Sequence, residues 1–261
     1  MSRIGARLLT LWAAVAYGLL FAPIMVIVLF SFNLPTGRFN LIWKGFTLEN
    51  WRHPFQDTAL TDAFLASLAL ALGASLIATL LGGLLAIGLS RHRGRGHGAI
   101  ELLLVLPLTS PEIVLASSLL NLFVLLNLPR GFGSLLIAHS LFCLSFAALT
   151  LKARLGGVDW SLEAAASDLG ASPLRTFAHI TLPLLAPGLL AAFLLSFSLS
   201  LDDYIISAFN AGQVILFPLY IAGAFQREIS PQIHVMATMV LLASVGLLGL
   251  GLGSQRGTGR G

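Results

Sequence analysis

Residues 163–171 read Glu163-Ala164-Ala165-Ala166-Ser167-Asp168-Leu169-Gly170-Ala171, and the chain continues with Pro173, Phe177, Ile180, Leu182-Pro183 and Pro187. This short stretch has a polar face and lies between the fourth and fifth long apolar runs of an otherwise apolar chain. A docking element on a membrane surface is the simplest use for it, because a soluble partner could drive the membrane part there. The plainer alternative is a structured loop that only closes a helical bundle.

Local signals divide this loop, residues 156–183, into two short helices. Ser161 suits the N-cap of the first, with the Glu163 carboxylate in the first turn, where it complements the helix dipole. Gly170 suits the left-handed residue that ends a helix. Ser172-Pro173 then reads as an N-cap followed by proline at the first helical position, and Pro183 is expected to end the second helix.

The composition is that of an integral membrane protein. Of 261 residues, 57% are hydrophobic and 10% are charged, and the mean hydropathy is +0.91. A soluble domain has about 25% charged residues. Cys143 is the single cysteine, so no disulfide framework exists. The sequence has no glycine-rich phosphate-binding loop ending in Lys-Ser or Lys-Thr, so we expect a chain that is not an enzyme and hydrolyses no ATP itself.

Six apolar segments reach the roughly 20 residues that a bilayer crossing needs. They are residues 8–32, 62–89, 100–126, 134–151, 184–209 and 233–252. The first run is too long for a cleaved signal peptide and no clear cleavage site follows it, so we expect a retained helix. The sequence thus predicts an all-α membrane protein with six transmembrane helices.

Lysine and arginine predict the orientation, because they concentrate on the cytoplasmic side. With the N-terminus inside, the cytoplasmic side holds Arg3, Arg7, Arg91, Arg93, Arg95, Lys152, Arg154, Arg175, Arg256 and Arg260. The outer side holds Arg38, Lys44, Arg52, Arg130 and Arg227. We therefore expect both termini and the 156–183 loop in the cytoplasm. Residues 33–60 and 210–231 then face outward, and Phe217–Ile221 should form a short interfacial helix or a re-entrant turn.

The pattern of the 156–183 loop resembles the EAA loop of ABC importer permeases, the MetI-like inner-membrane components of binding-protein-dependent transport. In that family the loop forms coupling helices that insert into a groove of a separate ATPase subunit. The resemblance gives this ATPase-coupling role to Glu163, Ala164, Ala165, Asp168, Gly170, Ala171, Phe177 and Pro183. It implies a type I ABC importer permease fold. Residues 1–60 would hold the first helix and a periplasmic loop, 61–254 the five-helix permease domain, and 255–261 a cytoplasmic tail.

Further motifs are similar to the spermidine/putrescine branch of these permeases, over nearly the whole chain. They are Phe46-Thr47-Leu48-Glu49-Asn50-Trp51, Ser110-Pro111-Glu112-Ile113-Val114, Ala138-His139, Phe142-Cys143, Leu199-Ser200-Leu201-Asp202-Asp203 and Pro231-Gln232-Ile233. Two departures are Glu112, where many relatives have Asp, and residues 144–146, where relatives often have a proline.

The resemblance implies a polyamine permease of the bacterial inner membrane that acts with several partners. These are a second homologous permease, two cytoplasmic ATPase subunits, a periplasmic substrate-binding protein and membrane lipid, and no nucleic acid. It implies no cofactor in this chain, since the partner ATPase would bind ATP and Mg.

Glu112 is the most informative residue for the substrate. It lies near the middle of its apolar segment, where an ionisable group is costly and usually functional. Pro107 and Pro111 bracket it, so we expect a broken helix, which is tolerated where backbone lines a cavity. The alternative is that Ser110-Pro111-Glu112 restarts a helix and the carboxylate only offsets its dipole.

Asp202 and Asp203 lie near the outer end of the fifth segment, and adjacent helical residues point about 100° apart. They are either headgroup-level acids or a negative ring that attracts a cation. Together with Glu112 they favour an organic cation over an anion. Tyr204 and Trp51 are candidate aromatic neighbours for ammonium groups, although both also suit an interfacial belt.

Other solutes remain open for such a permease: an opine-like compound, iron or thiosulfate. A different class is an ion-coupled secondary transporter, which would use the acids and His139 as a proton relay. His139 also suits a helix-packing hydrogen bond, and Gly82-Gly83 suits a close helix contact. Arg91–Arg95 fits a topology signal that touches anionic lipid.

Overall fold

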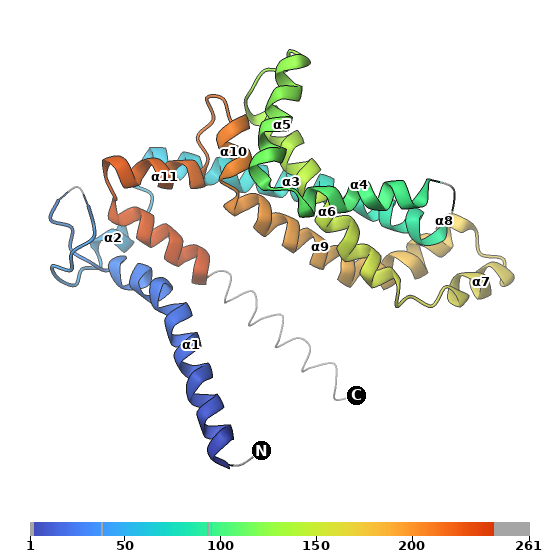
Figure 1. Cartoon of the computed structure of the whole chain (residues 1–261), viewed down its shortest axis with the longest axis horizontal. Helices are drawn as coiled ribbons and strands as arrows, with labels where there is room; N and C mark the ends of the chain where they lie inside the picture. The colour runs from blue at the N-terminus through green and yellow to red at the C-terminus, as the bar shows by residue number, and fades with distance from the viewer. Residues whose placement is uncertain (1–2, 38, 93, 95, 243–261) are drawn as a thin grey trace. The chain divides into compact units, whose positions relative to one another are not determined.

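The chain is seen in a computed structural model that describes residues 3–37, 39–92, 94 and 96–242 (Figure 1). Over these residues the regular elements are helices, with no strand beyond two isolated bridges. The elements are α1 (Arg3–Phe30), α2 (Glu49–Arg52), α3 (Thr58–Arg91), α4 (His97–Thr109), α5 (Glu112–Leu125), α6 (Phe132–Leu155), α7 (Ser161–Asp168), α8 (Pro173–Thr176), the π-helical turn η1 (Phe177–Thr181), α9 (Leu182–Asp202), α10 (Ile205–Asn210) and α11 (Phe217–Arg227). A further apolar helix covers Pro231–Leu242.

Four of these helical stretches are long and apolar enough to cross a membrane: Leu9–Phe30, Thr58–Arg91, Phe132–Leu155 and Pro173–Asp202. The pair α4 and α5 is bent by 111° and makes a fifth candidate if it counts as one span. The prediction of a multi-pass, all-α membrane protein is therefore confirmed. The sixth predicted segment begins in the Pro231–Leu242 helix, and its remainder lies outside the described residues.

The chain divides into two compact units, and each is described by itself. The first comprises residues 1–62 and 221–261, and the second comprises residues 63–220. The boundaries fall inside α3 and α11, so neither unit is an independent stretch of sequence.

In the first unit, buried asparagines fasten the loop after α1. The Asn33 amide donates to Asn40 Oδ1 at 2.7 Å, and the Asn50 amide donates to the Ser31 carbonyl at 3.1 Å. Trp51 stacks on Phe32 with ring centroids 5.4 Å apart. Since buried polar groups need partners, these contacts explain why asparagine and tryptophan stand here. They give Trp51 a structural role in this unit.

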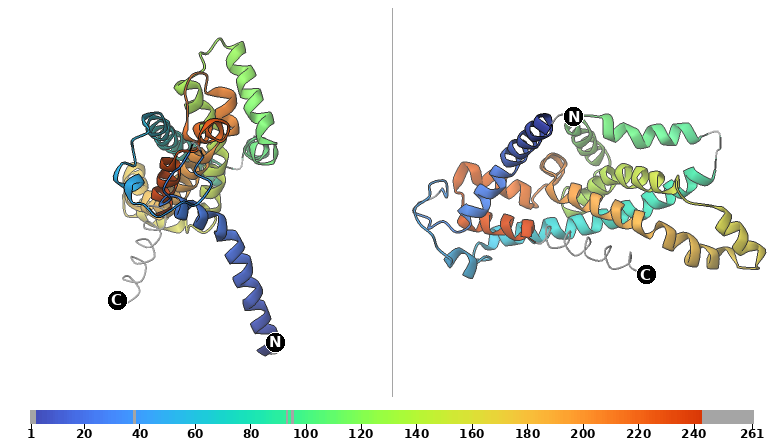
Figure 2. Two further views of the ribbon diagram at one scale, coloured as in Figure 1. Left: turned by 90° about the vertical axis from the view of Figure 1, so that its left-hand side faces the viewer. Right: turned by 90° about the horizontal axis from the view of Figure 1, so that it is seen from below.

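In the second unit α6 is the central helix, and it packs against α9, α4, α10 and α5 (Figure 2). Its core is built from small and aliphatic side chains together with the buried rings of Phe123 and Phe142. Helix α3 approaches α6 closely at Gly82, where an added Cβ would lie 2.8 Å from the Ala148 backbone nitrogen. The predicted close helix contact is thus confirmed at Gly82, because an added side chain would meet the backbone of α6 there. At Gly83 an added Cβ would make only ordinary contacts at 3.5 Å.

Pro183 does not end the second helix of the 156–183 loop, which corrects that expectation. The helix runs on from Pro173 to Asp202. Just before the proline it widens into η1, where the Leu182 amide donates to the Phe177 carbonyl, five residues back. A proline has no N–H for the usual bond and clashes with the carbonyl four residues earlier, so a wider turn accommodates it.

Candidate functional site

The 156–183 loop begins with a capped helix. The Ser161 amide donates to Asp159 Oδ1 at 3.0 Å, so Asp159 takes the capping role expected of Ser161. Hydrogen bonds from the side chain and the backbone amide of Ser161 hold the pKa of Asp159 below its usual value. Glu163 lies in the first turn, as predicted.

The first helix of the loop ends in the predicted glycine turn. Gly170 has φ +79°, a conformation that glycine adopts without strain. The Gly170 amide donates to the Ser167 carbonyl at 2.9 Å, and the Ala171 amide donates to the Ala166 carbonyl at 3.0 Å. This pair of bonds is a Schellman motif, which satisfies the last carbonyls of α7. Pro173 then opens α8 at its first position.

Two leucines flank this turn and project from it. Leu169 is 90% exposed and Leu174 is 79% exposed. The turn lies at one end of the second unit, together with α7 and α8 (Figure 1). Of the other residues assigned to coupling, Ala164, Ala165, Asp168, Phe177 and Pro183 are exposed, and Ala171 is half-buried. The loop therefore presents an apolar tip on an ordered backbone.

Glu163 ties the loop to two other elements. Its Oε1 lies 2.5 Å from Arg91 Nη2, at the last residue of α3, and the Thr181 hydroxyl in η1 donates to the same oxygen. The Arg91 guanidinium lies 4.9 Å from the ring centre of Trp160. Sequence reasoning missed Arg91, Trp160 and Thr181 as parts of this site. Arg91 and Thr181 are 72 and 18 positions from Glu163. Trp160 is close to Glu163 in sequence, but it takes part through its contact with the distant Arg91.

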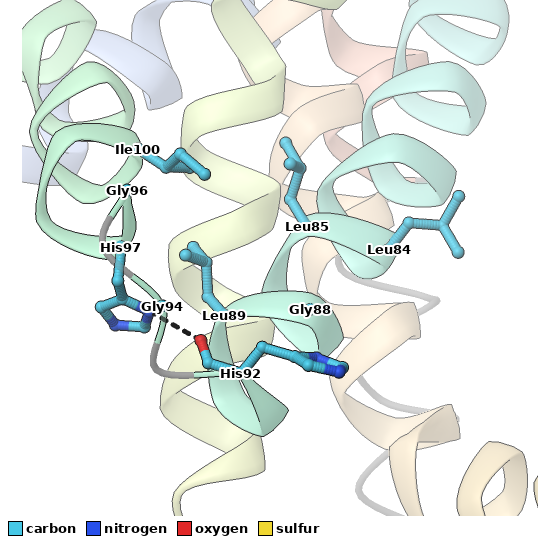
Figure 3. A pocket seen from close by; sticks show the side chains of 9 residues that line it. All are labelled: Leu84, Leu85, Gly88, Leu89, His92, Gly94, Gly96, His97 and Ile100. Carbon is cyan, nitrogen blue, oxygen red and sulfur yellow. Dashed lines mark hydrogen bonds between the residues drawn. The ribbon is translucent and has the colours of Figure 1, made fainter.

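A second charged group lies between α4 and α6. Glu101 accepts from Lys152 of α6 and lies 2.9 Å from His97 Nε2. His97 Nδ1 is 3.2 Å from the His92 carbonyl oxygen (Figure 3). A hollow of about 280 Å³ adjoins these residues, lined by leucines of α3 and by Ile100. His97 therefore lies between the Glu101 carboxylate and the His92 carbonyl oxygen.

The predicted carboxylates come together where two helices break. Glu112 is the first residue of α5, after the break between α4 and α5. Asp203 follows the last residue of α9 in an extended conformation, and α10 starts two residues later. Glu112 is an electrostatic neighbour of both Asp202 and Asp203. The expected break near Glu112 is confirmed, although the helix restarts at Glu112 rather than at Pro111.

The two aspartates differ sharply in environment. The Asp203 side chain is 1% exposed, and its Oδ1 accepts from the Ser207 amide at 3.0 Å. Its Oδ2 is buried without a hydrogen-bond partner among the described residues. Asp202 and Tyr204 are exposed. An unpartnered buried carboxylate oxygen is costly, so this one suits a site that a cation completes.

His139 supports this break from α6. Its Nδ1 lies 2.8 Å from Ser200 Oγ, and its Nε2 lies 3.2 Å from Ser207 Oγ and 3.8 Å from Asp203 Oδ1. The ring therefore links α6 to both α9 and α10, which confirms the packing interpretation of His139. Within the described residues no group of three or more His, Cys, Asp or Glu side chains could hold a metal.

Several apolar helices of membrane-spanning length define a multi-pass helical membrane protein. The chain belongs to the family described as binding-protein-dependent transport system inner membrane component, whose sequence profile matches residues 78–255. It is thus an inner-membrane component of such a system, as the 156–183 loop predicted.

Named relatives lie within this family. The chain is 39% identical over 235 residues to the spermidine/putrescine transport system permease protein PotC of Haemophilus influenzae, covering 90% of this chain and 91% of that one. It is 34% identical over 238 residues to the putrescine transport system permease protein PotI of Escherichia coli, covering 88% and 84%.

A solved structure shares the fold. It is that of a bacterial ABC transporter involved in the import of the acidic polysaccharide alginate, with a TM-score of 0.69 and 17% identity over 98% of each chain. The ABC permease fold of the present chain is therefore supported over its length.

Proposed function

We propose that the chain is the permease subunit of an ATP-driven ABC importer and forms half of a membrane pathway for polyamines, spermidine or putrescine. The names of relatives 34% and 39% identical support this substrate class. The observation that carries it in the chain itself is the carboxylate cluster of Glu112, Asp202 and Asp203 at two facing helix breaks.

The chemistry of the carboxylate cluster fits a polyamine. Ionised carboxyl groups close together repel one another, and an ammonium group between them removes that repulsion. The unpartnered Asp203 oxygen accepts from such a group, and exposed Asp202 meets the cation first. Tyr204 lies beside them as an aromatic face for a further ammonium.

The 156–183 loop would couple ATPase movement to the membrane part of the permease. We propose that Glu163, Ala164, Ala165, Asp168, Gly170, Ala171, Phe177 and Pro183 form the ATPase-coupling surface. The exposed leucine tip at Gly170 suits a groove of a soluble subunit, because removing exposed apolar side chains from water is favourable. ATP binding would close two ATPase subunits and move the loop. This movement would switch the pathway from inward-facing to outward-facing, and ATP hydrolysis would return it to the inward-facing state.

This function needs six spans with both termini in the cytoplasm, so that the 156–183 loop faces the ATPase. The domain division then is 1–60, 61–254 and 255–261. The partners are a second homologous permease, two ATPase subunits that bind ATP and Mg, a periplasmic binding protein and membrane lipid. This chain itself carries out no bond chemistry and holds no cofactor.

The test is uptake by the complete complex in proteoliposomes. Radiolabelled spermidine and putrescine are supplied with the binding protein outside and ATP inside, and thiosulfate, iron and an opine serve as competitors. We expect ATP-dependent polyamine uptake that only polyamines compete for. Uptake of one of the other solutes in place of polyamines, or uptake driven by an ion gradient without ATP, would overturn the proposal.

A further inference from the structure

Arg91 joins the end of a membrane-length helix to the 156–183 loop. It is the last residue of α3, a helix of 34 residues. Its guanidinium binds the Glu163 carboxylate on α7 and lies over the ring of Trp160, the residue before α7. One side chain therefore contacts two neighbouring parts of the loop.

The acceptor in this contact also holds a third element. Glu163 Oε1 accepts from the Thr181 hydroxyl, and Thr181 is the last residue of η1, which leads directly into α9. Glu163 thus connects α7 to α3 through Arg91 and to the start of α9 through Thr181. The second connection passes through a π-helical turn, a feature that is frequent at functional sites.

An isolated ion pair on the surface contributes little interaction free energy, because solvent screens the charges and two long side chains must be ordered. The Arg91 pair differs in three respects. The Glu163 side chain is 23% exposed, its oxygen has two donors, and the flat guanidinium is fixed against an aromatic ring. Arginine is suited to this double contact, since its planar group pairs and stacks at once, whereas lysine only pairs.

We infer that Arg91 is a positioning residue that transmits movement of the 156–183 loop to α3. This role rests on the proposed function, because it gives the loop's movement a route into the membrane part. It replaces the interpretation of Arg91 as a topology signal and lipid contact alone. Arg93 and Arg95 lie outside the described residues.

The experiment compares variants in the reconstituted complex and measures polyamine taken up per ATP hydrolysed. Arg91→Gln removes the ion pair and the cation–ring contact. Mutation of residues that couple two sites without touching a ligand changes the coupling by about two- to thirty-fold. We therefore expect the polyamine taken up per ATP hydrolysed to decrease by about two- to thirty-fold. Arg91→Lys keeps the charge and should restore the ratio in part.

Arg154→Gln is the matched control. Arg154 lies in the last turn of α6, its side-chain stem packs over Gly188, and glutamine retains that stem. The uptake ratio of this variant should stay at the wild-type value. The charge exchange Arg91→Glu with Glu163→Arg should transport more per ATP than Glu163→Arg alone, which a purely local packing role would not produce.

Two results overturn the inference: an unchanged ratio in Arg91→Gln, or no recovery in the charge exchange. If Arg91→Gln assembles poorly, amide hydrogen exchange of residues 161–168 in the isolated chain replaces uptake. Exchange must then rise in Arg91→Gln and fall again in the charge exchange. Failure of the proposed function looks different, because the wild-type complex itself would then show no ATP-driven polyamine uptake.

Discussion

Asp202 and Asp203 are adjacent in sequence but lie in opposite environments. Helix α9 ends at Asp202, whose side chain is exposed, while Asp203 turns into the interior with 1% of its side chain exposed. The break at Asp203 produces this difference, because its extended backbone redirects the side chain toward Ser207 and His139. In the proposed pathway we therefore expect the two carboxylates to act at different steps.

Neutralising each aspartate should separate these steps. Asp203→Asn keeps an oxygen that accepts from the Ser207 amide, so the fold should survive, but the charge beside the substrate is lost. A hydrogen bond to a charged group contributes about 1.5–3 kcal/mol. Loss of that contribution to substrate binding should raise the KM for spermidine about ten- to hundred-fold. Asp202→Asn alters a solvent-screened charge and should change KM by less than about fivefold. The concentration dependence of radiolabelled uptake measures both, and a larger effect at Asp202 would reverse the assignment.

The contact between α3 and α6 predicts a sensitive glycine. In Gly82→Ala the new Cβ would lie 2.8 Å from the Ala148 nitrogen and 3.0 Å from the Ala147 Cβ, so the helices must separate. Overpacking of this kind costs about 1–3 kcal/mol, and the thermal midpoint in detergent should fall. Gly88→Ala on the same helix meets nothing within 4 Å and should hold or raise the midpoint. Equal midpoints for the two variants would contradict the close contact.

Hydropathy and local signals predicted much of this fold. Long apolar runs yielded the membrane-length helices, and proline beside a carboxylate marked the break before Glu112. The glycine turn at Gly170 followed from its place after a short helix. Each of these features depends on residues within a few positions of one another, which is why the sequence reveals them.

Features that depend on distant contacts were not predictable. Arg91 and Glu163 are 72 positions apart, and nothing local distinguishes Arg91 from Arg93 or Arg95. The helix continues past Pro183 because η1 widens just before it, whereas proline alone indicates an end. The burial of Asp203 depends on Ser207 and His139, which come from two different elements.

The turn at Gly170 should be essential for coupling but not for insertion into the membrane. Gly170→Val places a β-branched residue at φ +79°, which costs about 1–2 kcal/mol although no neighbour lies within 4 Å. We expect the Schellman turn to open, so that less ATPase subunit copurifies and ATP-driven uptake falls about tenfold. Gly157→Val lies in the same loop, where an added Cβ would make only an ordinary contact, and should keep both properties. Normal copurification and uptake in Gly170→Val would rule out the turn as the coupling element.

The leucine tip should contribute to association and not to folding. Leu169 is 90% exposed, so Leu169→Ser removes almost no packing, and the unfolding free energy should change by less than about 0.5 kcal/mol. Burying a leucine against a partner contributes about 1.5–3 kcal/mol, which predicts roughly ten- to hundred-fold weaker binding of the ATPase subunit. Leu125→Ser, at a position 78% exposed at the end of α5, makes the same chemical change away from the 156–183 loop and should leave binding unchanged. Titration of the purified ATPase subunit against each variant in nanodiscs measures this affinity. If both serine variants bind as tightly as the wild type, the tip lies outside the contact.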